Sequence, residues 1–229
     1  MRLLVTLALS SGGPVFAHDQ WLEGQRSPEA VTGRLFLGDG KTVEELPRKP
    51  ERLARFELIT GDDIATFAAD ARAKPAGVAP PAPFLAAIYE SKPATLELTP
   101  AKFAAYVKED SVVAPPGLSL KGRTKPVTEK YTRCLVAVPS PSGPVGCEFE
   151  LVLRSVDPLL VVAHKAGRPV KGQLVFLKER TGRVVAKAST DGEGLASFGH
   201  ARGHRVTAIL MTKGEDTDVR SFWAATTLP

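Results

Sequence analysis

The chain has 229 residues, of which 43% are hydrophobic and 24% charged, and this composition is typical of a globular protein rather than a disordered or collagen-like one. Its 20 glycines and 19 prolines are spread along the sequence, which argues against a bundle of long helices. The formal net charge is +5, but lysine and arginine occur singly or in pairs among acidic residues, so no basic stripe indicates a nucleic-acid partner.

The first 17 residues have the pattern of a secretory signal peptide. Arg2 precedes an apolar stretch, a Ser/Gly/Pro break follows, and the segment 15–17 fits the small-x-Ala cleavage rule. We therefore predict cleavage after Ala17 and an exported, periplasmic mature chain. The apolar stretch is far shorter than the ~20 residues of a membrane-spanning helix, so we expect no membrane span after cleavage. The alternative is a buried first strand of a cytosolic protein.

Residues 18–156 are predicted to form a β-rich N-terminal domain, because short apolar runs alternate with Gly, Pro and Asp turns. The Ala/Pro-rich segment 70–83 predicts an exposed loop, and a strand is expected over 84–91. One short helix is expected near residues 100–109. It would begin with Thr99 as its N-cap and Pro100 at its first position.

Cys134 and Cys147 are the only cysteines, and an even number in an exported chain favours a structural disulfide. They lie in two alternating runs joined by PSPSGPV, which predicts a β-hairpin with the cysteines directly opposite each other. Such a bridge would contribute about 3 kcal/mol. Two buried reduced thiols are the alternative, whereas the spacing and the lack of a neighbouring histidine argue against zinc.

The C-terminal third, residues 157–229, repeats strands of five to eight residues followed by Gly or Pro turns, and this spacing predicts a second, smaller β-sandwich. The segment SVDP interrupts two apolar runs, so we place the domain boundary at 156/157. The predicted fold class is therefore mainly all-β, with two sandwich-like domains and one helix.

Cleavage after Ala17 would make His18 the first residue of the mature chain. Its α-amine and imidazole could then chelate one metal ion, because both groups deprotonate near neutral pH, with pKa values of ~8 and ~6.5. Copper(II) and nickel(II) prefer such nitrogen donors. The alternative is that His18 only tethers the terminus.

Three other residues are candidate metal ligands. Asp19 could supply an oxygen, and His204 and His164 could each supply a nitrogen. The structural alternatives are a solvated turn for His204 and a hydrogen-bonded histidine at a domain edge for His164. His200, four residues before His204, has the same alternative as its neighbour.

The sequence has no HExxH, GxSxG, P-loop or Rossmann glycine motif, so we predict that the protein is not an enzyme. A copper oxygenase that uses the terminal amine, its imidazole and a second histidine is a distant alternative. A chain with two tryptophans and three tyrosines shows no aromatic face for its substrate.

Several motifs resemble a bacterial periplasmic family whose members are described as nickel or cobalt uptake-associated proteins. They are AHDxWL at 17–22, PATLELTPAKFAAYVK at 93–108, EKYTR at 129–133, TDG at 190–192 and SFWA at 221–224. The resemblance extends in order from His18 to the C-terminus, and the AHDxWL start is its most specific part. Members commonly carry a histidine just before the methionine of the penultimate strand, and Leu210 occupies that position here.

The resemblance implies that the second domain is immunoglobulin-like or transthyretin-like and that the protein takes part in divalent-metal uptake, with nickel or cobalt as its cofactor and a membrane metal-transport system as its partner. Copper and zinc stay open as alternatives. The resemblance also places His18 at the first mature position of the family.

The second hypothesis is a β-sandwich interaction module that holds no metal and docks on an exported or membrane transport partner. Leu210 favours this second hypothesis, and Trp21 and Trp223 are interpreted as packing residues.

Overall fold

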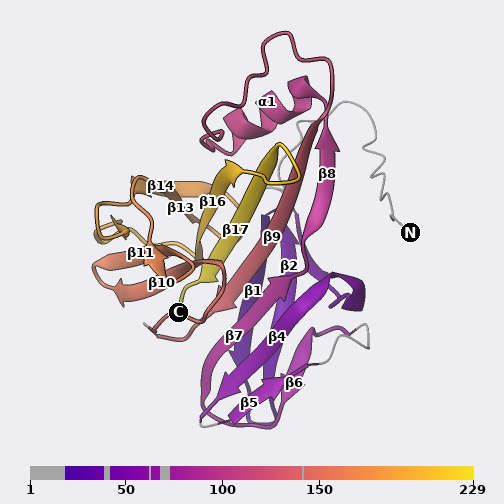
Figure 1. Ribbon diagram of the computed structural model, residues 1–229. Coiled ribbons are helices and arrows are strands. Elements are labelled where there is room, and N and C mark those ends of the chain that lie inside the picture. Colours follow the sequence, from indigo (N-terminus) through magenta and orange to yellow (C-terminus); the bar gives the residue numbers. More distant parts are fainter. Residues whose placement is uncertain (1–18, 39–41, 62, 68–72, 141) are drawn as a thin grey trace.

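The computed structural model describes residues 19–38, 42–61, 63–67, 73–140 and 142–229 (Figure 1). The predicted signal peptide, its cleavage site and His18 lie outside these ranges. The described chain is mainly β, with one α-helix and one short 3-10 helix, so the predicted fold class is confirmed. No helix in these ranges is long and apolar enough to cross a membrane.

The largest sheet has nine strands that come from the whole length of the described chain. Eight of them follow the order β14(Val184–Ser189), β13(Leu174–Lys178), β16(Arg205–Lys213), β17(Val219–Thr227), β9(Val127–Ala137), β7(Phe84–Ser91), β4(Leu53–Thr60) and β5(Asp63–Thr66), and β8(Ala94–Leu98) pairs with β9 as well. Only the pair β17–β9 is parallel.

Two four-stranded sheets accompany it. The first has the order β1(Asp19–Arg26), β2(Val31–Gly38) and β3(Val43–Leu46), with β6(Gly77–Ala79) also paired to β2; the 3-10 helix η1(Pro50–Arg52) follows β3. The second has the order β10(Phe149–Val156), β11(Leu159–Lys165) and β12(Arg168–Pro169), with β15(Leu195–Ser197) also paired to β11.

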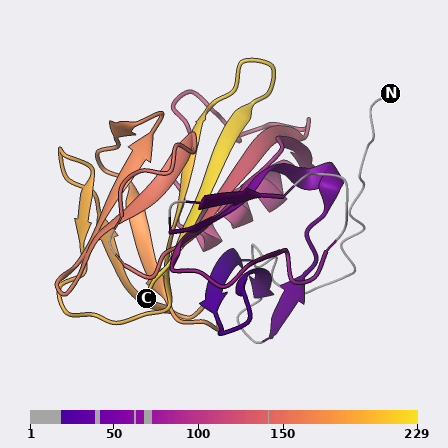
Figure 2. The ribbon, with the colours of Figure 1, turned by 90° about the horizontal axis from the view of Figure 1, so that it is seen from below.

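The nine-stranded sheet is apolar on both faces, because successive residues of a strand point to opposite sides. On β9, Cys134 and Val136 belong to the core shared with β10 and β11, whereas Leu135 and Ala137 belong to the core shared with β1 and β2. Figure 2 shows the orange C-terminal strands and the indigo to purple N-terminal strands on opposite sides of the yellow strands. The two sandwich-like parts therefore share their central sheet.

The predicted domain boundary at 156/157 falls in the turn of the β10–β11 hairpin. Strands from both sides of this position pair within the nine-stranded sheet, where β17 lies beside β9 over nine residue pairs. The division into domains 18–156 and 157–229 stays a prediction. The hydrogen-bonded sheet itself is continuous across it.

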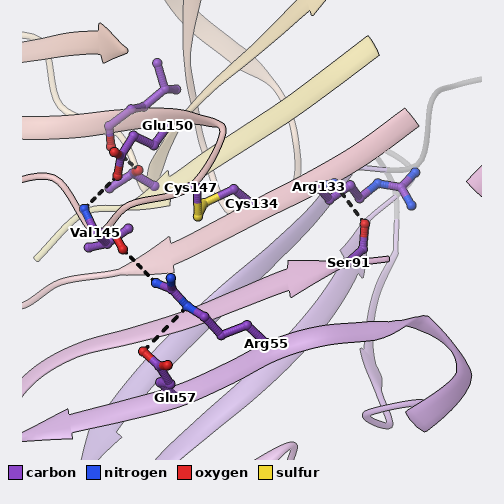
Figure 3. The surroundings of a disulfide bond; sticks show 10 residues. Arg55, Glu57, Ser91, Arg133, Cys134, Val145, Cys147 and Glu150 are labelled. Atoms are coloured by element: carbon purple, nitrogen blue, oxygen red, sulfur yellow. Dashed lines mark hydrogen bonds and ion pairs between the residues drawn. A yellow bond between two sulfur atoms is a disulfide. The ribbon is translucent and has the colours of Figure 1, made fainter. Parts of the chain in front are cut away.

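Cys134 and Cys147 form a disulfide, as predicted, but the prediction that they lie opposite each other in a β-hairpin is wrong. β9 has β17 on one side and β7 and β8 on the other, so no edge remains for β10, which pairs with β11 instead. The disulfide links β9 to the segment just before β10 across the core between two sheets (Figure 3). Alternating apolar residues fit facing sandwich strands as well as a hairpin, since both bury one side of each strand.

The helix α1(Pro100–Glu109) agrees with its prediction, including the N-cap: Thr99 Oγ1 accepts a hydrogen bond from the Lys102 amide at 3.3 Å. Of the exposed loop predicted over 70–83, residues 70–72 lie outside the described ranges; over 73–83 the prediction is wrong in part, because β6 pairs with β2 and residues 76 and 79 are buried. Gly77 fits there because a Cβ atom would meet the Phe56 ring at 2.5 Å.

Candidate functional site

The first described residue, Asp19, begins β1 and is bonded to His18. Strand β1 pairs with β2 over eight consecutive residues, from Asp19 opposite Gly38 to Arg26 opposite Val31. Its other anchor is a buried hydrogen bond of 2.6 Å from Thr227 Oγ1 to the Leu22 carbonyl. The start of the strand is therefore fixed from two sides.

The Asp19 carboxylate is held by two cations of the C-terminal third. Lys178 Nζ lies 2.9 Å from Oδ1 and 2.7 Å from Oδ2, and the guanidinium of Arg205 donates to Oδ2 at 3.1 Å. Arg205 is fully buried, and burial lowers its pKa while Asp19 acts in the opposite direction. Because two cations already neutralise Asp19, its oxygens are poor ligands for a further divalent cation.

Trp21 packs as predicted and carries no ligand role. It is fully buried, stacks on Phe36 with 5.6 Å between ring centroids, and has the Arg205 guanidinium 4.1 Å from the centre of its ring. Trp223, the other tryptophan, stacks on Tyr106 at 5.9 Å.

His204 lies close to β1 but is bound to a carboxylate there. Its Nε2 is 3.1 Å from Glu23 Oε1, which also accepts hydrogen bonds of 2.9 Å from Trp21 Nε1 and from Arg180 Nε. Burial raises the pKa of Glu23, but the hydrogen bonds of His204, Arg180 and Trp21 outweigh it and lower the value from 4.5 to about 2. His204 is thus part of a charged cluster that secures β1.

A small cavity of about 70 Å³ adjoins the start of β1, and Asp19 and Asp110 both line it. Asp110 follows α1, and its Oδ2 atom is buried and has no hydrogen-bond partner among the described residues. Burial raises the pKa of Asp110 from 3.8 to about 7, Lys178 opposes this rise, and Asp19 adds to it. The exposed carboxylate of Glu109 lines the same cavity.

His164 lies on β11, in the four-stranded sheet on the other side of the central sheet from β1. It is buried, faces Glu150 of β10 in the register, and its Nδ1 has no hydrogen-bond partner. Asp19 therefore lies on β1 and His204 contacts Glu23 of the same strand, whereas His164 lies in a different layer. His200 pairs with Asp157 on the surface.

Among the described residues, no three His, Cys, Asp or Glu side chains gather closely enough to hold a metal ion. A metal site at the start of β1 would thus need donors from His18, and Asp110 and Glu109 are the other carboxylates that line the cavity beside Asp19. Sequence reasoning missed Asp110, since an aspartate after a helix is ordinary and only the tertiary packing leaves its Oδ2 unpartnered. It also missed Glu23, although Glu23 lies within two residues of Trp21 in the AHDxWL segment.

Neither a protein-family model nor a curated protein matches this chain. Among solved structures, native alpha-2-macroglobulin from Escherichia coli, spanning domains MG0-NIE-MG1, aligns with 87% of this chain and 94% of its own, at 10% identity and a TM-score of 0.26. A likeness of this size leaves the function to be argued from the site itself.

Proposed function

We propose that this protein is an exported accessory protein that binds a divalent transition metal, nickel or cobalt, at the start of β1. His18 is the anchoring ligand through its α-amine and imidazole, and Asp110 adds a carboxylate oxygen. The observation that carries the proposal is that Asp110, whose Oδ2 has no hydrogen-bond partner among the described residues, lines a cavity together with Asp19, the residue bonded to His18.

The donor chemistry supports this assignment. Two nitrogens and one oxygen suit nickel, cobalt, copper and zinc, and nitrogen donors give the later first-row metals the higher affinity. Metal binding at Asp110 would also release a proton near neutral pH, because its pKa of about 7 leaves the carboxylate partly protonated there. Leu210, at the position of the histidine of the similar family, packs against an apolar core, so Asp110 replaces that ligand in our proposal.

Isothermal titration of the mature chain tests the proposal, once intact mass has confirmed His18 as the first residue. Nickel, cobalt, copper and zinc are each titrated into the wild type, His18→Ala, Asp110→Asn and the control Asp63→Asn, an exposed aspartate on β5. We expect a 1:1 complex that His18→Ala abolishes and that Asp110→Asn weakens at least tenfold, while Asp63→Asn binds as the wild type does.

Two results would contradict the proposal. One is the absence of binding of any of the four metals below roughly 100 μM, which corresponds to about −5.5 kcal/mol. The other is equal binding by the wild type and His18→Ala. In the processed chain, delivery of the metal to a membrane transport system in the periplasm would be the natural use of such a site.

A second candidate function, an interaction module without metal, is favoured by the free edge of the central sheet. β14 is the last strand of that sheet, and Val184 and Val185 are exposed on it. An extended segment of a partner could add to this edge by backbone pairing. Replacing Val185 with Lys would then abolish capture of a membrane transport partner, and the wild type would bind none of the four metals.

A further inference from the structure

We propose that a second pocket, between the central sheet and strands β2 and β3, binds a small organic carboxylate with an apolar or aromatic body. The pocket has a volume of about 340 Å³, which lies at the lower end of the range of ~300–1,000 Å³ for small-molecule sites. Gln20 and Arg133 also line the cavity beside Asp110, but neither Asp19 nor Asp110 lines this pocket, and its ligand does not depend on a bound metal.

Among the residues that the structure describes, four cationic side chains and no acidic side chain line this pocket. They are Lys49, Arg52, Lys92 and Arg133. Within the described ranges, none of the four forms an ion pair with a carboxylate. Unpaired positive charge around a concave surface attracts an anion.

Arg133 is the central cation, because two aromatic rings lie beside its guanidinium and it forms no ion pair within the described ranges, although its charge also acts on the buried Glu129. Its guanidinium carbon lies 4.8 Å from the ring centre of Tyr131 and 5.0 Å from that of Trp223. Its Nε is buried and finds no hydrogen-bond partner in the part of the chain that the structure describes. Its backbone amide donates to Ser91 Oγ at 2.9 Å, as Figure 3 shows. A planar guanidinium held in this way can donate two parallel hydrogen bonds to a carboxylate.

Arg52 and Lys92 are placed together by the backbone, since the Lys92 amide donates to the Arg52 carbonyl at 2.8 Å. Burial raises the pKa of the nearby Tyr89, and the charges of Arg133 and Arg52 both oppose this rise. The two arginines therefore act on the same phenol at the pocket wall. The exposed Glu51 acts on it in the opposite direction, more weakly than either arginine.

The remaining wall decides between an organic and an inorganic anion. Leu37 and Leu46, from β2 and β3, line the pocket opposite the tyrosines of the central sheet, together with Phe36 and Pro47. An inorganic phosphate would leave these apolar groups in contact with water, whereas the apolar body of an organic acid would cover them. The pocket thus matches a ligand with one charged end and one apolar end.

Titration with three probes tests this inference: benzoate, its neutral analogue benzamide, and inorganic phosphate. We expect benzoate to bind at least tenfold more tightly than either of the other two. Arg133→Met, which keeps an unbranched side chain between the two aromatic rings, should weaken benzoate binding at least tenfold. Arg154→Met, at an exposed position of β10, is the matched control and should leave it unchanged.

Arg52→Met provides a second variant in case Arg133→Met does not fold, and it should weaken benzoate binding at least threefold. Equal affinity for benzoate and benzamide would overturn the inference, because the cations would then play no part. Tighter binding of phosphate than of benzoate would overturn the role of the apolar wall. Unchanged benzoate binding in Arg52→Met and in a folded Arg133→Met would place the ligand elsewhere.

Discussion

Replacing Glu23 by Gln should make the stability of the protein less sensitive to acid. Hydrogen bonds from His204, Arg180 and Trp21 lower the pKa of Glu23 to about 2 against the opposing effect of burial. A carboxylate with a depressed pKa in the folded state stabilises fully above its unfolded value of 4.5, and this contribution is lost as the pH falls towards 2. Between pH 6 and pH 3 the lost contribution amounts to about 2 kcal/mol.

Urea unfolding at pH 6 and pH 3, followed by circular dichroism, measures this contribution. The wild type should be more stable than Glu23→Gln at pH 6, and the difference in the free energy of unfolding should shrink by about 2 kcal/mol at pH 3. Glu97→Gln, at an exposed position of β8, serves as the control and should track the wild type at both pH values. A difference between the wild type and Glu23→Gln that stays constant with pH would refute the role of this hydrogen-bonded carboxylate.

Three further substitutions test how the strands are held. Asp19→Asn should lower the free energy of unfolding by about 3 kcal/mol, because the buried Arg205 loses its charged partner, and urea unfolding measures this loss. Replacing Cys134 and Cys147 by Ala should lower the free energy of unfolding by about 3 kcal/mol, because the disulfide closes a loop between residues 13 apart in the sequence. The urea midpoint should fall accordingly and should no longer change when reductant is added. Thr99→Ala should cost about 1 kcal/mol in thermal unfolding, and Thr99→Ser, which keeps the capping oxygen, should restore most of it.

The sequence predicted those elements for which local residue types have one dominant structural use. Thr99 followed by Pro100 predicted the start of α1, because a hydroxyl cap and a missing amide suit only that end of a helix. Strand partners were harder to predict. β9 pairs with β17, about 90 residues later in the chain, and an alternating pattern reveals which face of a strand is apolar but not which strand lies beside it.

The residues of the candidate site likewise divide into those that the sequence could single out and those that only the folded structure reveals. Asp19 could be singled out because it follows the residue expected at the mature N-terminus. Asp110 could not, because it belongs to no motif, and the EKYTR motif that ends at Arg133 gave no hint of a binding role; the interest of both residues comes from a buried atom without a partner among the described residues. Such burial arises from the packing of segments that lie far apart in the sequence.

The anchoring of β1 supports the metal site that we propose at the start of this strand. Lys178 and Arg205 of the C-terminal third hold Asp19, and Thr227 holds the Leu22 carbonyl, so the ladder between β1 and β2 is fixed before any ligand arrives. Ordering one backbone residue costs about 1–2 kcal/mol. In a chain cleaved after Ala17, the proposed site would place the metal one residue from this rigid strand, so little further backbone would have to be fixed on binding. Ordering a tail of five residues on binding would cost several times as much free energy as ordering one. Cleavage after Ala17 and the anchoring of Asp19 would therefore both lower the free-energy cost of binding a metal at His18.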